Sequence, residues 1–203
     1  VNVYTVNVTN ESGSTATFGG VTLTNNGAFT VGGNVTFTAA VHTLTGTGNF
    51  AADTITTIPA GATVSTSSNH TLGSLVIDLG GIFNITDDTI SFRSTVVPPI
   101  TNNGTFTTTN STITYLFGAG AQTLATANIV YNNLTIDNPS DVTLDGSETV
   151  NGILTLTSGK IITGVNVLSI APGGSVVRVA GHVVGNFLKN VALGATSRTF
   201  EIG

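Results

Sequence analysis

A short cadence repeats along this chain, and it limits the folds that the chain can adopt. Asn-Gly or Asn-Asn opens a short alternating stretch in the phrases NNGAFTV, NNGTFTT, NNLTID and NGILTLT. Gly and Asn favour tight bends, whereas Thr and Val are stiff at χ1 and favour strands. Short strands separated by a bend about every ten residues predict an all-β fold with almost no helix.

The chain also repeats itself over a longer distance. NNGAFTV and NNGTFTT start 77 residues apart, and Ile58–Val64 resembles Asn138–Leu144 at an offset of 80. The offset drifts by only a few residues, as it would in a duplicated block with small insertions in its bends. We therefore expect one domain over residues 1–203 with an internal duplication of about 25–84 and 102–163.

Strict alternation assigns each strand an inward and an outward face. Leu154 and Leu156 should point inward with Thr155 between them outward, and Val177 and Val179 should also point inward. The predicted core contains Phe29, Phe37, Leu75, Ile77, Phe106, Leu134, Ile136, Leu154, Leu156 and Leu168.

The charge content helps to choose between a β-solenoid and a pair of β-sandwiches. Only 7% of the residues are charged, against roughly 25% in an average globular protein. In a solenoid, equivalent residues of successive coils stack about 4.8 Å apart, where two like charges repel by roughly 1 kcal/mol even in water. Thr stacks without this cost, and Asn can hydrogen-bond up the ladder. The composition favours the solenoid, with roughly nine coils and a length on the order of 45 Å if a coil takes about twenty residues.

A family resemblance supports this interpretation. The stretch YNNLTIDNPSDVTLDGSETVNGILTLTSGKIITGVNVLSIAPGGSV, Tyr131–Val176, resembles repetitive regions of very large bacterial surface and secreted proteins. These are Thr-, Asn- and Gly-rich, adhesin-like β-helix proteins, often exported by the type IX pathway. TNNGTFTTTNSTITYLFGAGAQTL is similar to their other recurring phrase. The resemblance covers roughly residues 21–203 and implies a right-handed parallel β-helix with irregular coils, displayed outside the cell.

Composition argues against several partners. Five Lys and Arg stand singly against ten Asp and Glu, and the net charge is −5. Without a basic patch or an aromatic stripe, nucleic-acid binding is not expected. The apolar runs are far shorter than a membrane span. The absence of Cys excludes disulfides and thiolate sites and suits an oxidising, extracellular place.

The acidic residues provide the only candidate for a metal site. Asp137, Asp141 and Asp145 form a set whose oxygens suit Ca²⁺, but their spacing matches neither an EF-hand loop nor a calcium β-roll. We keep them as weak calcium candidates and predict no cofactor.

No group of residues predicts catalysis. His42, His70 and His182 lie far apart, have no neighbouring carboxylates and are interpreted as bend or surface residues. No G-x-S-x-G elbow occurs, and the acids are too scattered for a polysaccharide lyase or hydrolase of the β-helix type. The chain is predicted not to be an enzyme.

Thr-x-Thr pairs leave a binding role open. Such pairs place hydroxyls on one side of a strand, as in the flat ladders of ice-binding β-solenoids, although drifting coil length argues against a flat ladder here. The leading prediction is a non-enzymatic, extracellular structural or adhesive module of a bacterial surface protein or filament. The alternatives are an ice- or neutral-polysaccharide-binding solenoid and, third, a β-helix polysaccharide lyase or hydrolase.

Both ends of the sequence continue the strand rhythm without a polar cap. An open solenoid end is an unprotected sheet edge. The expected partners are therefore further copies of the chain in a homopolymer or flanking coils of a longer chain, with surface glycans as a further partner. The residues predicted for self-association are Val1, Val3, Val6, Val8, Phe200 and Ile202.

Overall fold

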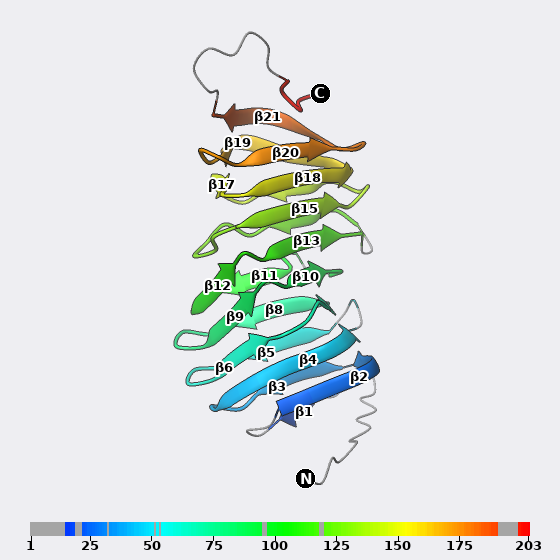
Figure 1. The fold of residues 1–203 in the computed structure, drawn as a ribbon, viewed down its shortest axis with the longest axis vertical. Coiled ribbons are helices and arrows are strands. Elements are labelled where there is room, and N and C mark those ends of the chain that lie inside the picture. The colour runs from blue at the N-terminus through cyan, green and yellow to red at the C-terminus, as the bar shows by residue number, and fades with distance from the viewer. Residues whose placement is uncertain are drawn as a thin grey trace.

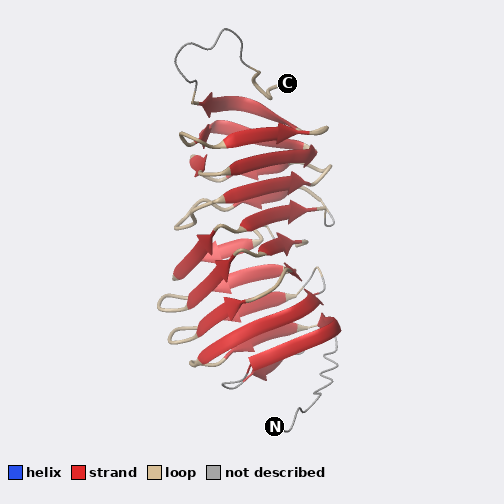
Figure 2. Cartoon of the chain, in the orientation of Figure 1, coloured by secondary structure: helices blue, strands red, loops and turns tan. Residues whose placement is uncertain are grey.

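The chain forms an elongated stack of parallel β-strands, with β1 and β21 at opposite ends of the rod (Figure 1). The computed structural model describes residues 15–18, 22–31, 33–50, 52, 54–94, 97–117, 120–190 and 199–203. Strands but no helix occur in these residues (Figure 2). The stack is a β-solenoid of about 7 turns, which confirms the predicted all-β parallel fold.

Three sheets make up the solenoid. The first sheet contains β1 (Thr15–Phe18), β3 (Asn34–Phe37), β5 (Ile55–Ile58), β8 (Ser74–Ile77) and β11 (Ile100–Asn102). The long sheet contains β2 (Thr22–Val31), β4 (Val41–Phe50), β6 (Thr63–Thr66), β7 (His70–Leu72), β9 (Ile82–Thr86), β10 (Thr89–Phe92), β12 (Thr105–Thr109), β13 (Thr112–Leu116), β15 (Asn133–Asp137), β18 (Ile153–Ser158) and β20 (Ser175–Arg178). The third sheet contains β14 (Gln122–Leu124), β16 (Val142–Leu144), β17 (Glu148–Val150), β19 (Lys160–Ile170) and β21 (His182–Lys189).

Coil length varies, as expected for irregular coils. Thr63 pairs with Ile82, 19 residues further on, whereas Leu75 pairs with Ile100, 25 residues further on. The described residues form about 7 turns, fewer than the nine coils predicted, because many coils exceed twenty residues; residues 1–14 and 191–198 lie outside the described residues.

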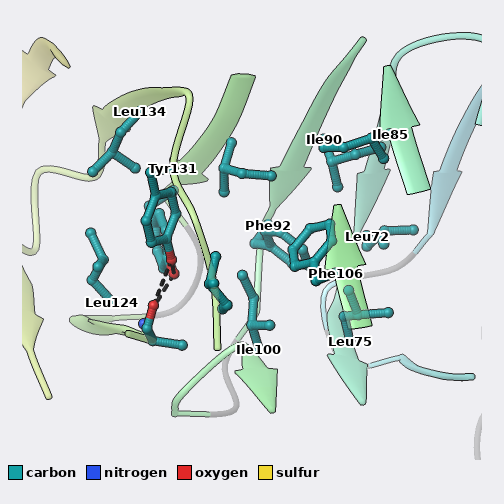
Figure 3. Packing of buried hydrophobic residues seen from close by; sticks show 14 of the residues in the cluster. Leu72, Leu75, Ile85, Ile90, Phe92, Ile100, Phe106, Leu124, Tyr131 and Leu134 are labelled. Atoms are coloured by element: carbon teal, nitrogen blue, oxygen red, sulfur yellow. Dashed lines mark hydrogen bonds between the residues drawn. The ribbon is translucent and has the colours of Figure 1, made fainter. Parts of the chain in front are cut away.

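The core runs as one cluster inside the stack (Figure 3). Nine predicted core residues are buried, namely Phe37, Leu75, Ile77, Phe106, Leu134, Ile136, Leu154, Leu156 and Leu168. Phe29 lies in β2, whose side chains are outside the described set. Burying a large apolar side chain contributes about 1.5–3 kcal/mol, so these inward columns supply the main stabilisation of the rod.

The prediction for β20 was wrong. Val177 and Val179 are 47% and 68% exposed. Val176 pairs with the inward Leu154, and Val177 pairs with the outward Thr155, so the inward set starts one residue earlier. Valines on both parities in SVVRVA made the faces ambiguous, and a slip of one residue exchanges them.

The tight corners depend on residues that tolerate unusual backbone. Gly159, between β18 and β19, has φ +71°, a conformation that residues with a Cβ rarely adopt. A Cβ at this position would also collide with the carbonyl oxygen of Asn138 in the coil below. Glycine therefore lets two successive coils approach closely at this corner.

Side chains at strand starts connect successive coils. In four places within the described residues, an Asn or Asp side-chain oxygen accepts a hydrogen bond from the amide that opens a strand one coil further on, which we call a strand-start bond. The four bonds join Asn34 to Ile55, Asn69 to Thr89, Asn133 to Ile153 and Asp141 to Lys160, at 2.7 to 2.9 Å. Asn133, in the repeated phrase NNLTID, thus has a structural use besides the preference of Asn for bends.

The sheets change partners near the middle of the rod. β13 pairs with both β10 and β15, so the long sheet continues there. Among the described strands, β11 pairs only with β8 and β12 only with β9. Residues 125–132, which we call the seam segment, have one isolated bridge, from Tyr131 to Val150.

The segments that match in sequence occupy different places in the coil. Ile58–Val64 leads from β5 of the first sheet to β6 of the long sheet. Asn138–Leu144 leads instead from β15 of the long sheet to β16 of the third sheet. The duplication itself stays a prediction, and any copied block would lie at a different rotation about the rod axis.

Candidate functional site

The structure separates two of the calcium candidates by giving each its own partner in the next coil. Asp137 accepts a hydrogen bond from the Ser158 hydroxyl at 2.8 Å. Asp141 accepts the Lys160 amide at 2.9 Å, and its second oxygen lies 3.7 Å from the Lys160 ammonium group. These carboxylates connect coils, which is a structural use.

Asp145, the third candidate, holds the seam segment. Its Oδ1 atom accepts hydrogen bonds from the Thr126 amide at 3.0 Å and from the Thr126 hydroxyl at 2.7 Å. In the part of the chain that the structure describes, no three His, Cys, Asp or Glu side chains group to hold a metal ion. The three aspartates therefore do not form a shared ligand set.

Glu148 is an unusual carboxyl that the sequence analysis did not single out. It opens β17 and pairs with the buried Leu168 in the coil above, so it occupies an inward position. Burial raises the pKa of Glu148 to about 7; the hydrogen bond from the Thr149 amide lowers it, and nearby Asp145 raises it. Its only sequence signal is a carboxylate on the inward parity of a short strand.

Two buried tyrosines, of which Tyr131 lies in the seam segment, form a polar centre in the core. The hydroxyls of Tyr115 and Tyr131 lie 2.8 Å apart, and neither side chain is exposed. Tyr131 donates to the Ala125 carbonyl at 2.7 Å, and the Ala125 amide donates to the Tyr115 hydroxyl at 3.2 Å (Figure 3). Burial raises the pKa of both phenols, so both stay protonated and hydrogen-bonded.

Two histidines contradict the expectation of bend or surface positions. His42 is 1% exposed, donates from Nε2 to the Thr38 carbonyl at 2.9 Å, and packs against Phe37 with ring centroids 5.0 Å apart. His70 is 2% exposed, with Nε2 near Leu44 and Ser68. Both lie on inward parities of β4 and β7 because an imidazole ring fills core space much as a phenyl ring does.

An uncharged column runs along the outward parity of the long sheet. Successive pairings join Thr71, Ser91, Thr114, Thr135, Thr155 and Val177, of which Thr114 is only 7% exposed. We call this set the outer column. The preceding outward positions on its strands hold Thr89, Thr112, Asn133, Ile153 and Ser175. Thr-x-Thr therefore recurs only irregularly on this face, and no flat two-column Thr ladder results.

The described residues of the C-terminal end include a small cover over β21. Glu201 is 6% exposed and accepts two hydrogen bonds from Lys189, each of 3.0 Å, and Ile202 bridges to Val183. Two of the predicted self-association residues, Phe200 and Ile202, are 42% and 49% exposed. The others, Val1, Val3, Val6 and Val8, lie outside the described residues.

Comparisons with known proteins add no family: no family model, no curated protein and no solved structure matches this chain. No helix in the described part of the chain is long and apolar enough to cross a membrane. Function must therefore be argued from the solenoid itself.

Proposed function

We propose that the chain is a non-enzymatic structural or adhesive β-solenoid module, displayed outside the cell on a bacterial surface protein or filament. The observation that carries this proposal is the outer column, whose residues are all uncharged over five successive pairings. A column of this kind can be extended without the electrostatic repulsion that stacked charges would add at each coil. It suits a spacer rod better than a compact binding domain.

The use of the acidic residues supports the same proposal. Asp137, Asp141 and Asp145 each form hydrogen bonds to an adjacent coil. Carboxylates that hold coils together stiffen the rod and leave fewer charged groups for recognition. Tight connections between coils also suit a protein that must resist proteases outside a cell.

Association through the rod ends belongs to this proposal. Leu188, Phe200 and Ile202 are 60%, 42% and 49% exposed at the C-terminal end. A head-to-tail contact between such ends does not close and generates a filament. The partner is a second copy of the chain or a flanking coil of a longer one.

Electron microscopy of the purified chain tests the proposal. We expect single rods or end-to-end polymers, with the inner coils resistant to limited proteolysis. Replacing both Phe200 and Ile202 by Ser should shorten any polymer while the far-ultraviolet circular dichroism stays that of strands. Hydrolysis or elimination of a polysaccharide that is lost on substituting a single Asp, Glu or His would overturn the non-enzymatic assignment.

A second function, binding of a neutral polysaccharide, is favoured by the same outer column. Hydroxyl and amide groups repeated along a rod can hydrogen-bond to sugar hydroxyls without any charge. The variant Thr135→Val should weaken retention on an insoluble neutral polysaccharide, whereas Thr36→Val, on the first sheet, should not. Equal retention of both variants and the unchanged chain would leave the spacer as the function.

A further inference from the structure

The seam segment is held differently from other parts of the rod. Below it, Asn102 and Asn128 exchange side-chain to carbonyl hydrogen bonds of 2.8 and 3.5 Å, and Thr108 donates to the carbonyl of Val130. These side-chain hydrogen bonds take the place of the backbone hydrogen bonds that would otherwise pair β12 with the next coil. A few side-chain bonds hold less firmly than a ladder in which each residue contributes backbone bonds.

The backbone amides at the start of the seam segment also depend on side chains. The Ala125 amide donates to the Tyr115 hydroxyl, and the Thr126 amide donates to the Asp145 carboxylate. Backbone pairing with the coil above begins at Tyr131, whose carbonyl accepts the Asn151 amide at 2.9 Å. Local opening therefore needs only the loss of a small set of contacts.

Glu148 lies above this weakly paired segment. The isolated bridge pairs Tyr131 with Val150, so the same parallel register places Ile129, which is 5% exposed, opposite Glu148. On its other side Glu148 pairs with the buried Leu168. A carboxyl between two apolar neighbours fits this position when it is protonated and loses hydration when it is charged.

Among the described groups around Glu148, the Thr149 amide favours the charged carboxylate, donating to Oε1 at 2.7 Å, and the neighbouring acidic groups oppose it. Asp145 on the same turn is a second carboxylate, and the phenols of Tyr115 and Tyr131 lie close enough to be affected by both. Leu168 above and Ile129 below carry no charge. No Lys, Arg or His is among the groups that influence Glu148 in the described chain.

We propose that the seam segment is the part of the solenoid that opens first, and that ionisation of the inward Glu148 promotes its opening. The charged side chain turns out to water and uncovers Ile129 and the tyrosine pair. The rod thereby gains a hinge that is closed in acid and looser in alkali. This inference does not depend on the proposed function.

The sign follows from linkage. Burial raises the pKa of Glu148 from 4.5 to about 7, so the closed state holds this proton more tightly than the open state does. Stability of the closed segment is complete below the open-state value and falls as the pH rises toward about 7. Opening should increase by up to about tenfold between pH 6 and pH 8, an upper limit because the side chain is partly exposed to solvent screening.

Hydrogen exchange on the full chain at pH 6 and pH 8 measures this opening. Each amide rate is divided by the intrinsic rate of the unfolded chain at the same pH. We expect residues 125–132 to exchange faster than β9 and β18, and their corrected rate to increase with pH. Glu148→Gln should abolish the increase, whereas Asp88→Asn, which alters a carboxylate bonded to Thr66, should retain it.

A second variant keeps the test decisive if Glu148→Gln folds poorly. Glu148→Leu should slow the exchange of residues 125–132 at both pH values, because Leu continues the apolar column. The proposal is overturned if residues 125–132 are as protected as β9 and β18. It is equally overturned if Glu148→Gln or Glu148→Leu keeps the pH dependence of the unchanged chain.

Discussion

Each coil has three strands both before and after the seam, but the sheets that supply these strands differ between the two regions. In residues 33–116, β6 and β7 both pair with β4, so the long sheet supplies two strands to each coil and the first sheet supplies one. In residues 120–189, β16 and β17 both pair with β19, so the third sheet supplies two strands and the long sheet one. The corner at which one long strand pairs with two strands of the next coil therefore lies on a different side of the rod in the two regions.

This difference shows which feature of a coil is fixed. The inward residues form one core cluster that extends through both regions. The long strand of a coil belongs to a different sheet in the two regions. It is β4, of 10 residues, in the first region and β19, of 11 residues, in the second. Core continuity is thus the stronger constraint, and backbone ladders can end where side chains replace them, as in the seam segment.

The largest effects are expected from removing core side chains in either region. Leu75→Ala and Leu154→Ala should each lower the free energy of unfolding by about 2–5 kcal/mol, because both side chains are fully buried. Chemical denaturation measures both. Thr155→Ala, next to Leu154 on the outward parity, is the control and should cost far less. A cost much smaller at Leu75 than at Leu154 would contradict a core that is equivalent in the two regions.

The next effect concerns the tyrosine pair beside the seam. Tyr115→Phe removes the acceptor of the Ala125 amide and a partner of the Tyr131 hydroxyl. Leaving buried polar groups without a partner costs about 1–3 kcal/mol. The double variant Tyr115→Phe with Tyr131→Phe should cost less than the sum of the single variants, because the two hydroxyls share one network. Additive costs would show that the hydroxyls act independently.

The fold was largely predictable, whereas the seam was not. Alternation and low charge identified a parallel solenoid, and Leu154 and Leu156 gave their faces correctly because Thr separates them. The prediction that Val177 points inward was wrong because valines at both odd and even positions show no alternation from which to choose the inward face. The seam depends on Asn102, Thr108 and Tyr131, whose sequence neighbours look like those of any other strand. No local pattern indicates that their partners are side chains.

The candidate site depends even more on distant partners. Asp145 and Thr126 lie 19 residues apart, a typical coil spacing, but variable coil length hides which residues meet. Glu148 could have been noticed as a carboxylate on an inward parity, yet its pairing with the buried Leu168, one coil away, shows only in the structure. Sequence spacing suggested that the three aspartates could bind calcium together. It could not show that each aspartate already has its own hydrogen-bond partner in another coil.

Stacked charges should disturb both regions by a smaller amount. Thr135 pairs with Thr155, and Thr36 pairs with Thr57. Replacing both members of either pair by Lys should cost about 1 kcal/mol beyond the two single substitutions, since the charges stack about 4.8 Å apart. The extra cost should shrink in 1 M salt. A salt-independent penalty would mean that packing, and not repulsion, keeps charge off these faces.

The smallest effect is expected where the two regions solve the same problem with different residues. Strand-start bonds are made by Asn34 before the seam and by both Asn133 and Asp141 after it. Asp141→Asn keeps an oxygen for the Lys160 amide and removes only an ion pair of 3.7 Å, whose Lys160 side chain is 48% exposed. Because such exposed pairs contribute roughly 0–1 kcal/mol, thermal unfolding should change little.

The matched test removes the acceptor itself. Asn133→Ala deletes the oxygen that receives the Ile153 amide at 2.8 Å, and a hydrogen bond of this kind contributes about 0.5–1.5 kcal/mol. Asn133→Ala should therefore destabilise the chain more than Asp141→Asn does. If Asp141→Asn proves the more harmful, charge rather than the side-chain oxygen is what the strand start requires, and the abundance of Asn in this chain would need a different physical reason.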